Sequence, residues 1–360
     1  MNPEFLAIDL FCGAGGMSLG ASAAGIEIAL AVDADPNAAR TYAANHPGAK
    51  VYTGDIRQLT SASIARINKH NRPTVIFGGP PCQGFSYSNL RTRSVSNGNN
   101  WLFREFVRIV KAWKPDWVVF ENVKGIIDTA GGVFVDSVES SIQSLGYKTC
   151  RGLLNAMHFG VPQDRARFFL LACRTGVTPK MPKPSRKKTP TVRDAIFDLP
   201  YLTNGSAEQW KPYRKVKAST YAHRLRSGNR LSPNHLVSRN NALVLERYKN
   251  IPQGGNWQDV PSRLMRNYTD SSRCHTGIYH RLRFNRPSVV IGNYRKNMLI
   301  HPTQNRGLSV REAARIQSFP DSYEFHGSIG FQQQQVGNAV PPFLARAVFE
   351  AILLQHSNAK

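Results

Sequence analysis

The chain has 360 residues, 41% of them hydrophobic, which is enough to build two ordinary domains with a sizeable core. It carries 47 Lys and Arg against 23 Asp and Glu, and the formal net charge of +24 favours a polyanionic partner. Five cysteines without a C-x-x-C pair argue against a disulfide framework and a thiolate zinc site. The N-terminus does not read as a signal peptide, and no run of about 18 apolar residues predicts a membrane span.

Residues 1–175 alternate short apolar runs with helix-like stretches. Buried strands are predicted at 4–11, 27–35, 74–79, 115–123 and 166–174, and helices at 16–26, 36–46, 101–113 and 134–147. A further short strand is expected to end at the sequence TGDI. This β-α-β alternation predicts an α/β fold with a doubly wound, mostly parallel sheet.

The character of the chain changes near residue 176. A Pro- and Lys-rich linker, TPKMPKPSRKKTP, is followed by a region without clear periodicity, so a smaller irregular domain with short strands is predicted. Residues 181–300 hold 23 basic and 6 acidic side chains, a net charge of +17 interleaved with aromatic residues, which suits nucleic acid. A merely soluble basic surface is the alternative.

Two helices are predicted near the C-terminus. One begins after Ser309, with Glu312 three residues later as the second half of a capping box, and the last is opened by prolines. We place a first domain over 1–176, completed by a C-terminal helix over 326–358, and a smaller basic domain over 177–325.

Polar and glycine residues follow the first three predicted strands. Gly13, Gly15 and Gly16 form a turn in which backbone can approach a ligand closely. Asp33, 20 residues after Gly13, is placed to accept hydrogen bonds from a ribose, and Asp55 could contact a base. These residues predict a nucleoside-cofactor pocket at the carboxyl edge of the sheet. Ordinary acids at strand ends are the alternative.

The sequence FGGPPCQGFS follows the next strand and carries Cys82. Pro80 and Pro81 make the turn stiff, which is what a nucleophile held in place requires. A lone cysteine is more often a small buried hydrophobe, but this one lies on a loop outside an apolar run.

Three charged residues could act beside Cys82. Glu121 ends the strand in FENV, so it would project from the same edge of the sheet, and apolar neighbours could keep it protonated. Arg165 and Arg167 are two residues apart and share one face if the backbone is extended. A surface arginine in a salt bridge is the alternative for each.

The order of motifs resembles the C5-cytosine DNA methyltransferases, in their compact bacterial or phage form. The motifs are DLFCGAGG, VDADP, GDI, GGPPCQGFS, FENV, QDRAR, RGLSVREAARIQSFP and QVGNAVPP. They cover residues 7–176 and 278–356, and eight motifs in register are specific. The uncovered segment, 177–277, is where this family places its variable target-recognition region.

The resemblance implies S-adenosyl-L-methionine as methyl donor, S-adenosyl-L-homocysteine as product, and no metal. The cofactor-binding positions implied by the motifs are Phe11, Gly13, Gly15, Gly16, Asp33, Asp55, Ile56, Pro80, Leu102, Asn338 and Val340. Among them, Asp33 would hold the ribose, and Asp55 with Ile56 would hold the adenine.

The resemblance also implies a covalent mechanism on a flipped-out cytosine. The Cys82 thiolate would add to C6 and activate C5, a protonated Glu121 would donate to N3, and Arg167 would bind O2, with Arg165 as a further catalytic candidate. Residues 86–100 would form a closing loop, in which Ser86, Ser88, Arg91 and Arg93 contact DNA.

The resemblance therefore predicts a DNA (cytosine-5-)-methyltransferase that acts as a monomer on double-stranded DNA. We expect it in the bacterial cytoplasm, associated with the nucleoid, with a cognate restriction endonuclease as a candidate partner. Two alternatives stay open: a tRNA cytosine-5 methyltransferase on the same core, and a non-catalytic DNA-binding protein with a methyltransferase-like core.

Overall fold

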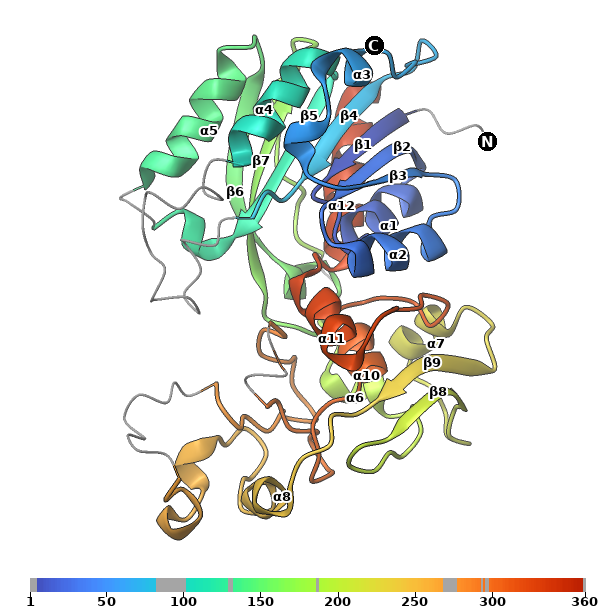
Figure 1. Ribbon diagram of the computed structural model, residues 1–360, viewed down its shortest axis with the longest axis vertical. Coiled ribbons are helices and arrows are strands. Elements are labelled where there is room, and N and C mark those ends of the chain that lie inside the picture. Colours follow the sequence, from blue (N-terminus) through green and yellow to red (C-terminus); the bar gives the residue numbers. More distant parts are fainter. Residues whose placement is uncertain are drawn as a thin grey trace. The chain divides into compact units, whose positions relative to one another are not determined.

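A computed structural model describes residues 5–81, 102–128, 132–185, 188–267, 277–292, 294 and 298–358 (Figure 1). The chain divides into two compact units. The first consists of Met1–Phe159, Ala166–Ser185 and Pro342–Lys360, and the second of Gly160–Arg165 and Arg186–Pro341. The domain boundaries expected at 176 and 326 stay predictions, since the units are interleaved along the chain.

A seven-stranded sheet forms the centre of the first unit. Its strands are β1 (Phe5–Leu10), β2 (Ile26–Asp33), β3 (Lys50–Thr53), β4 (Thr74–Gly78), β5 (Trp117–Val123), β6 (Lys148–Asn155) and β7 (Ala166–Cys173). The spatial order is β3-β2-β1-β4-β5-β7-β6, and β7 runs antiparallel to both of its neighbours while the pairs from β3 to β5 are parallel. The predicted doubly wound, mostly parallel α/β fold is confirmed.

Strand β6 was not predicted, because it lies at an edge of the sheet. Its sequence, KTCRGLLN, has a single buried residue, Leu154, so it lacks the continuous apolar run of a central strand. The antiparallel ladder with β7 selects its conformation, and this tertiary contact leaves no periodic pattern in the sequence.

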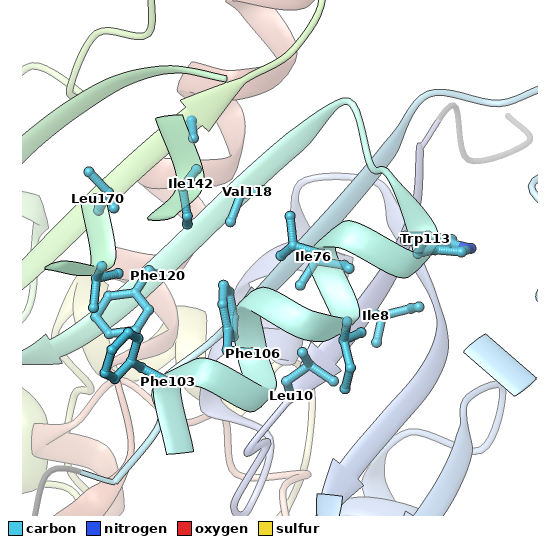
Figure 2. Close-up of a cluster of buried hydrophobic side chains, with 14 of the residues drawn as sticks. Ile8, Leu10, Ile76, Phe103, Phe106, Trp113, Val118, Phe120, Ile142 and Leu170 are labelled. Atoms are coloured by element: carbon cyan, nitrogen blue, oxygen red, sulfur yellow. The ribbon is translucent and has the colours of Figure 1, made fainter. Parts of the chain in front are cut away.

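Helices cover the sheet on both faces. They are α1 (Gly16–Ala23), α2 (Pro36–Asn45), α3 (Ser61–Ala65), α4 (Leu102–Trp113), α5 (Val133–Gln143) and α12 (Pro342–Ser357), with 3-10 turns η1 (Ile56–Gln58), η5 (Lys124–Ile126) and η7 (Ala156–Phe159). Figure 2 shows how α4 meets one face of the sheet: Phe106 packs edge-on against Phe120, with ring centroids 5.6 Å apart. Phe103, Ile109 and Trp113 of α4 belong to the same buried cluster.

Helix α12 belongs to the first unit although it comes from the far end of the chain. The ring of Phe349 lies 4.8 Å from that of Phe77 in β4, and the indole nitrogen of Trp117 lies 3.4 Å from Nδ1 of His356. A Cβ on Gly20 of α1 would stand 2.5 Å from Cβ of Ala345, so glycine is what allows α1 and α12 to approach this closely.

Two helices replace the single C-terminal helix that was expected over 326–358. Helix α11 (Ile329–Asn338) belongs to the second unit, and Ala339 leaves helical backbone at ψ 146° before Pro341 and α12. Within the part of the chain that the structure describes, Ile329–Ser357 is the one stretch long and apolar enough to span a membrane by length and composition. Because 56% of its apolar window is buried inside the protein, it is typical of core helices.

The second unit has short elements, as the irregular sequence predicts. They are α6 (Val192–Ile196), β8 (Ala207–Pro212), α7 (Thr220–Arg226), β9 (Leu231–Leu236), α8 (Ala242–Lys249), η8 (Trp257–Asp259), η9 (Ser262–Leu264), α10 (Val310–Ile316) and α11. Strands β8 and β9 pair antiparallel. A small apolar cluster around Tyr248, Tyr279 and Ile300 forms one part of its core.

Buried arginines hold much of this unit together. Arg281 donates to the carbonyl oxygens of Ile251, at 2.6 Å, and His301, at 2.8 Å. Arg315 is wholly buried and forms ion pairs with Asp198 and Asp321. Each guanidinium supplies up to five donors to backbone and side chains that elements this short leave unpaired.

The predicted capping box at the start of α10 is confirmed and is part of a buried ion pair. Glu312 accepts from the backbone N–H of Ser309 at 2.8 Å, and its own N–H donates to the Ser309 hydroxyl at 3.1 Å. Arg306 reaches the same carboxylate at 2.6 Å. Burial alone would raise the pKa of Glu312, but the Arg306 guanidinium outweighs it and holds this pKa at about 2.

We predict that Glu312→Gln lowers the free energy of unfolding by about 3 kcal/mol at pH 7, because Arg306 is left buried without its charged partner. The folded-state pKa lies below the ordinary value of 4.5, so the pair stabilises the fold above pH 4.5 and this contribution is lost as pH falls towards 2. Denaturant titrations across this window should show a shallower decline for Glu312→Gln than for the unmodified chain. Glu350→Gln, which removes an exposed ion pair with Arg346, should change little; a similar loss in both variants would contradict the prediction.

Candidate active site

The site lies at the carboxyl edge of the sheet, where the strand order reverses between β1 and β4. Leu10 is in register with both Val32 of β2 and Gly78 of β4, and Gly78 is in register with Phe120 of β5. The next residues, Phe11, Asp33, Gly79 and Glu121, therefore follow at one level along this edge. Crevices of this kind are where doubly wound sheets bind their ligands.

The turn after β1 is held in left-handed backbone conformations. Gly13 has φ 53° and Gly15 has φ 86°, and Gly15 also precedes the first residue of α1. Phe11 has φ 62°, which is unusual for a bulky residue and costs on the order of 1–3 kcal/mol. A Cβ on Gly13 would meet no atom within 4 Å, so the space beside the turn is open.

Asp33 joins the end of β2 to this turn. One carboxylate oxygen accepts from the backbone N–H of Gly13 at 2.7 Å, and the other accepts from Asp35 N–H at 2.8 Å. Burial raises the pKa of Asp33, although both backbone donors oppose the change. The structure thus brings together the glycine turn and the acid that the sequence predicted, with lone pairs left for further donors.

Asp55 and Ile56 follow β3, as predicted. Ile56 is buried, whereas the Asp55 carboxylate caps η1 and accepts a hydrogen bond from Nε of Arg57 at 2.9 Å. The hydrogen bonds from Arg57 lower the pKa of Asp55. This carboxylate is already engaged in a local, exposed ion pair, so its contact with a base stays a prediction.

A buried network beneath the glycine turn was missed by sequence reasoning. Asp9 accepts from the Ser18 hydroxyl at 2.6 Å, which in turn accepts from the Tyr42 hydroxyl at 2.7 Å. His46 packs on Tyr42, and burial lowers its pKa to about 4, so it is neutral at pH 7. The one available signal was Asp9 itself, a polar residue inside the apolar run FLAIDL.

Glu121 and Arg167 form an ion pair at the same edge. Glu121 of β5 is in register with Phe169 of β7. Arg167 lies two residues before Phe169 in β7, so its side chain is on the same face of the sheet as that of Glu121. Nε of Arg167 lies 3.1 Å from Oε1 of Glu121, and each side chain is only 10% exposed. Burial lowers the pKa of Arg167, and the Glu121 carboxylate opposes this.

The turn after β4 is packed tightly around this pair. A Cβ on Gly78 would stand 1.9 Å from the Leu10 carbonyl oxygen, and one on Gly79 would stand 2.6 Å from Oε2 of Glu121. The side-chain amide of Asn122 donates to the Pro80 carbonyl oxygen at 3.0 Å and so fixes the first proline of the turn. Asn122 was not predicted, although its place beside Glu121 in FENV was a signal.

Several predicted site residues lie elsewhere. Cys82, Ser86, Ser88, Arg91 and Arg93 fall outside the described residues. Leu102 is half-buried at the first residue of α4. Arg165, Asn338 and Val340 belong to the second unit, where the wholly buried Arg165 donates to three backbone carbonyl oxygens. These bonds describe a structural role, and a catalytic role for Arg165 stays a prediction.

Comparisons with known proteins show which family and which relatives this chain resembles. The family model described as C-5 cytosine-specific DNA methylase matches residues 5–354. The Type II methyltransferase M1.HphI of Haemophilus parahaemolyticus is 38% identical, over 98% of this chain and 87% of its own. The Type II methyltransferase M.DdeI of Desulfomicrobium norvegicum is 34% identical, over 96% and 88%.

Solved structures share the fold. A prophage-encoded E. coli protein, described as a candidate DNA modification methyltransferase, aligns over 98% of this chain and 99% of its own, with a TM-score of 0.81 at 25% identity. The Entamoeba histolytica methyltransferase EhMeth aligns over 99% of both chains with a TM-score of 0.65 at 14% identity, which shows the fold alone.

We predict that Gly79→Ala lowers the free energy of unfolding by about 1–3 kcal/mol, because the new Cβ displaces the Glu121 carboxylate from Arg167. The same substitution in a Glu121→Ala background should cost at least about 1 kcal/mol less. Gly48→Ala, whose Cβ would meet no atom within 4 Å, is the matched control and should be nearly neutral. Equal costs of Gly79→Ala in both backgrounds would show that Glu121 is not what the Cβ displaces.

Proposed function

Because the chain belongs to the C-5 cytosine-specific DNA methylase family, we propose that it methylates C5 of a flipped-out cytosine through a covalent bond between Cys82 and C6. The observation that carries this proposal is the buried Glu121–Arg167 pair beside the Pro80 turn. The pair supplies charged hydrogen-bonding groups at the edge of the sheet. Gly79, which packs against Glu121, precedes the proposed nucleophile Cys82 by three residues.

The first unit fits S-adenosyl-L-methionine as cofactor. Gly13 leaves open space beside the point where the strand order reverses, and Asp33 has acceptor capacity for ribose hydroxyls. Ile56, which is buried directly after Asp55, would lie beside the adenine ring. When bound, S-adenosyl-L-methionine supplies the methyl group, and S-adenosyl-L-homocysteine is the product.

The proposed chemistry needs the chain to activate a poor carbon nucleophile. Addition of the Cys82 thiolate to C6 moves electron density to C5 and negative charge towards N3 and O2. Arg167 is a permanent cation and would stabilise charge at O2. After methylation at C5, a base, for which water is the candidate, takes the C5 proton, so that Cys82 leaves as its thiolate and the aromatic ring is restored.

Glu121 would recognise the cytosine edge. Its carboxylate can accept from the exocyclic amine, which thymine lacks, and so it would select cytosine. Protonated Glu121 would donate to N3 of the cytosine, and Oε1 of the same carboxyl group lies 3.1 Å from Nε of Arg167. We propose that this Glu121 proton moves towards N3 as the bond between Cys82 and C6 forms and negative charge develops on the ring.

The biological setting follows from the same proposal. The chain acts on DNA, and the Type II names of its relatives support a restriction-modification system with a cognate endonuclease. We propose a monomer on double-stranded DNA in the bacterial cytoplasm. The basic segment 181–300 would make most of the phosphate contacts.

Substitution of the nucleophile tests the mechanism. Cys82→Ala should abolish methylation while binding of S-adenosyl-L-homocysteine survives, since the cofactor contacts are untouched. An oligonucleotide with 5-fluorocytosine at the target should form a covalent adduct that proteolysis and mass spectrometry locate at Cys82, because fluorine at C5 blocks the elimination step. Cys150→Ala removes another free cysteine and should keep both activities. Methylation by Cys82→Ala would rule out the covalent scheme.

Salt dependence tests the basic segment. Affinity for duplex DNA should fall by about 100-fold or more between 50 and 200 mM salt, because phosphate contacts release counterions. Removing the exposed charges of Lys215 and Lys217 should lower the slope of log K against log salt by about 1 each. Lys50→Gln, at an exposed position of the first unit, is the control. A slope that does not change with the double substitution would show that these lysines contact no phosphate.

A further inference from the structure

A chain of buried hydrogen bonds lies beneath the glycine turn and links three elements of the first unit. Asp9 comes from β1, Ser18 from α1 and Tyr42 from α2, and each of these residues is at most 1% exposed. The Ser18 hydroxyl donates to Asp9 at 2.6 Å and accepts from the Tyr42 hydroxyl at 2.7 Å. We refer to Asp9, Ser18 and Tyr42 as the Ser18 network.

Tyr42 connects this network to the turn itself. Its side chain belongs to a small apolar cluster with Cys12, a residue of the turn, and Ala31 of β2. The Tyr42 ring also packs on His46, with ring centroids 4.4 Å apart, and the His46 imidazole donates a hydrogen bond to the backbone of Gly15. The network therefore contacts the turn through both apolar packing and a hydrogen bond.

The turn needs such support because its backbone is held in an unfavourable conformation. The φ angles are 62° at Phe11, 53° at Gly13 and 86° at Gly15. A bulky residue stays in this region only where the surrounding structure fixes it. Asp33 holds the Gly13 N–H, and the Ser18 network spans the turn, from two residues before Phe11 to three residues after Gly15.

The position of the turn gives this support a consequence for binding. The turn lies at the carboxyl edge of the sheet where the strand order reverses, and a Cβ on Gly13 would meet no atom within 4 Å, so there is room for a ligand beside it. Ser18 and Tyr42 are themselves 0% exposed and cannot reach that space.

We propose that Ser18 and Tyr42 are positioning residues for the cofactor, which act by holding the glycine turn in the conformation that binds it. This role rests on the proposed function, because S-adenosyl-L-methionine is the cofactor proposed for this turn. It adds two residues that lie outside the turn and the strand ends. A turn that is already fixed loses less conformational freedom when the ligand binds, and this raises affinity.

Direct binding and kinetics test the role of Tyr42. Tyr42→Phe keeps the ring that packs on His46 and removes only the hydroxyl. It should raise the dissociation constant of S-adenosyl-L-homocysteine, measured by calorimetry, by about 5-fold, because a less firmly held turn must be ordered on binding. The KM for S-adenosyl-L-methionine should rise in parallel, while kcat at saturating cofactor should change less than about 2-fold. Unchanged affinity would overturn the inference.

A double-mutant cycle tests whether the two hydroxyls act together. Ser18→Ala removes the hydroxyl that both Asp9 and Tyr42 bind, and it should also raise the dissociation constant by about 5-fold. Independent effects would multiply to about 25-fold in the double variant, whereas residues of one network should give only about 5- to 10-fold. Fully multiplicative losses would contradict a shared role for Ser18 and Tyr42.

Tyr147→Phe is the matched control. Tyr147 is a buried tyrosine of the same unit, and its hydroxyl donates to the Pro115 carbonyl oxygen at 2.7 Å. Pro115 precedes β5, so this bond lies towards the opposite edge of the sheet from the glycine turn. At a temperature where circular dichroism shows each variant folded, Tyr147→Phe should bind S-adenosyl-L-homocysteine within about 2-fold of the unmodified chain.

The outcomes separate the positioning role from the proposed cofactor. An equal loss of affinity in Tyr147→Phe and Tyr42→Phe would overturn the inference, since affinity would then follow general destabilisation. Normal affinity in both Ser18→Ala and Tyr42→Phe would reject the positioning role and leave the cofactor in place. If the unmodified chain bound no S-adenosyl-L-homocysteine, the proposed cofactor itself would be wrong.

Discussion

The approach of β1 to β4 is the constraint on which the rest of the site depends. The strand order reverses between these neighbours, so the turns after both strands open into one crevice, and the register of Leu10 with Gly78 sets them at one level. The contact tolerates only glycine at position 78, because a Cβ would stand 1.9 Å from the Leu10 carbonyl oxygen. The glycine turn, Asp33 and Glu121 take their places from this register. Asn122 then ties the first proline of the next turn to β5.

Part of the large positive charge of the chain is buried inside the second unit. Within the basic segment 181–300, Arg247 and Arg281 are buried and donate to backbone carbonyl groups. Arg306 and Arg315, beyond that segment, are buried against carboxylates. A unit with short helices and one small pair of strands leaves many backbone groups unpaired, and arginine supplies the donors to satisfy them. Net charge therefore overstates the exposed basic surface of this unit, to which residues such as Lys215 and Lys217 belong.

Much of the first unit could be predicted from its sequence because local patterns and tertiary packing agree there. The central strands are continuous apolar runs, and α4 buries the predicted face with Phe106 and Ile109. In the second unit, the Ser309–Glu312 capping box could be predicted because it is a short-range signal. Strand β6 was missed because an edge strand needs no apolar run. The network of Asp9, Ser18 and Tyr42 was missed because its members are distant in sequence and only the folded sheet and helices bring them together. For Cys82, the motif remains the whole argument.

Arg165 and Arg167 show where spacing stops being informative. Two residues apart, they share a face in an extended chain, and the pattern QDRAR predicted neighbouring roles for them. The backbone is regular strand only from Ala166 onward, so Arg167 projects beside Glu121 under the β5–β7 ladder. Arg165 belongs to the preceding segment, which pairs with residues near Ser288, and its guanidinium turns to the end of α11. A boundary between two compact units falls between these residues. The same side chain on either side of this boundary therefore meets a carboxylate in one case and backbone carbonyl groups in the other, so the spacing of the two arginines does not predict what each of them contacts.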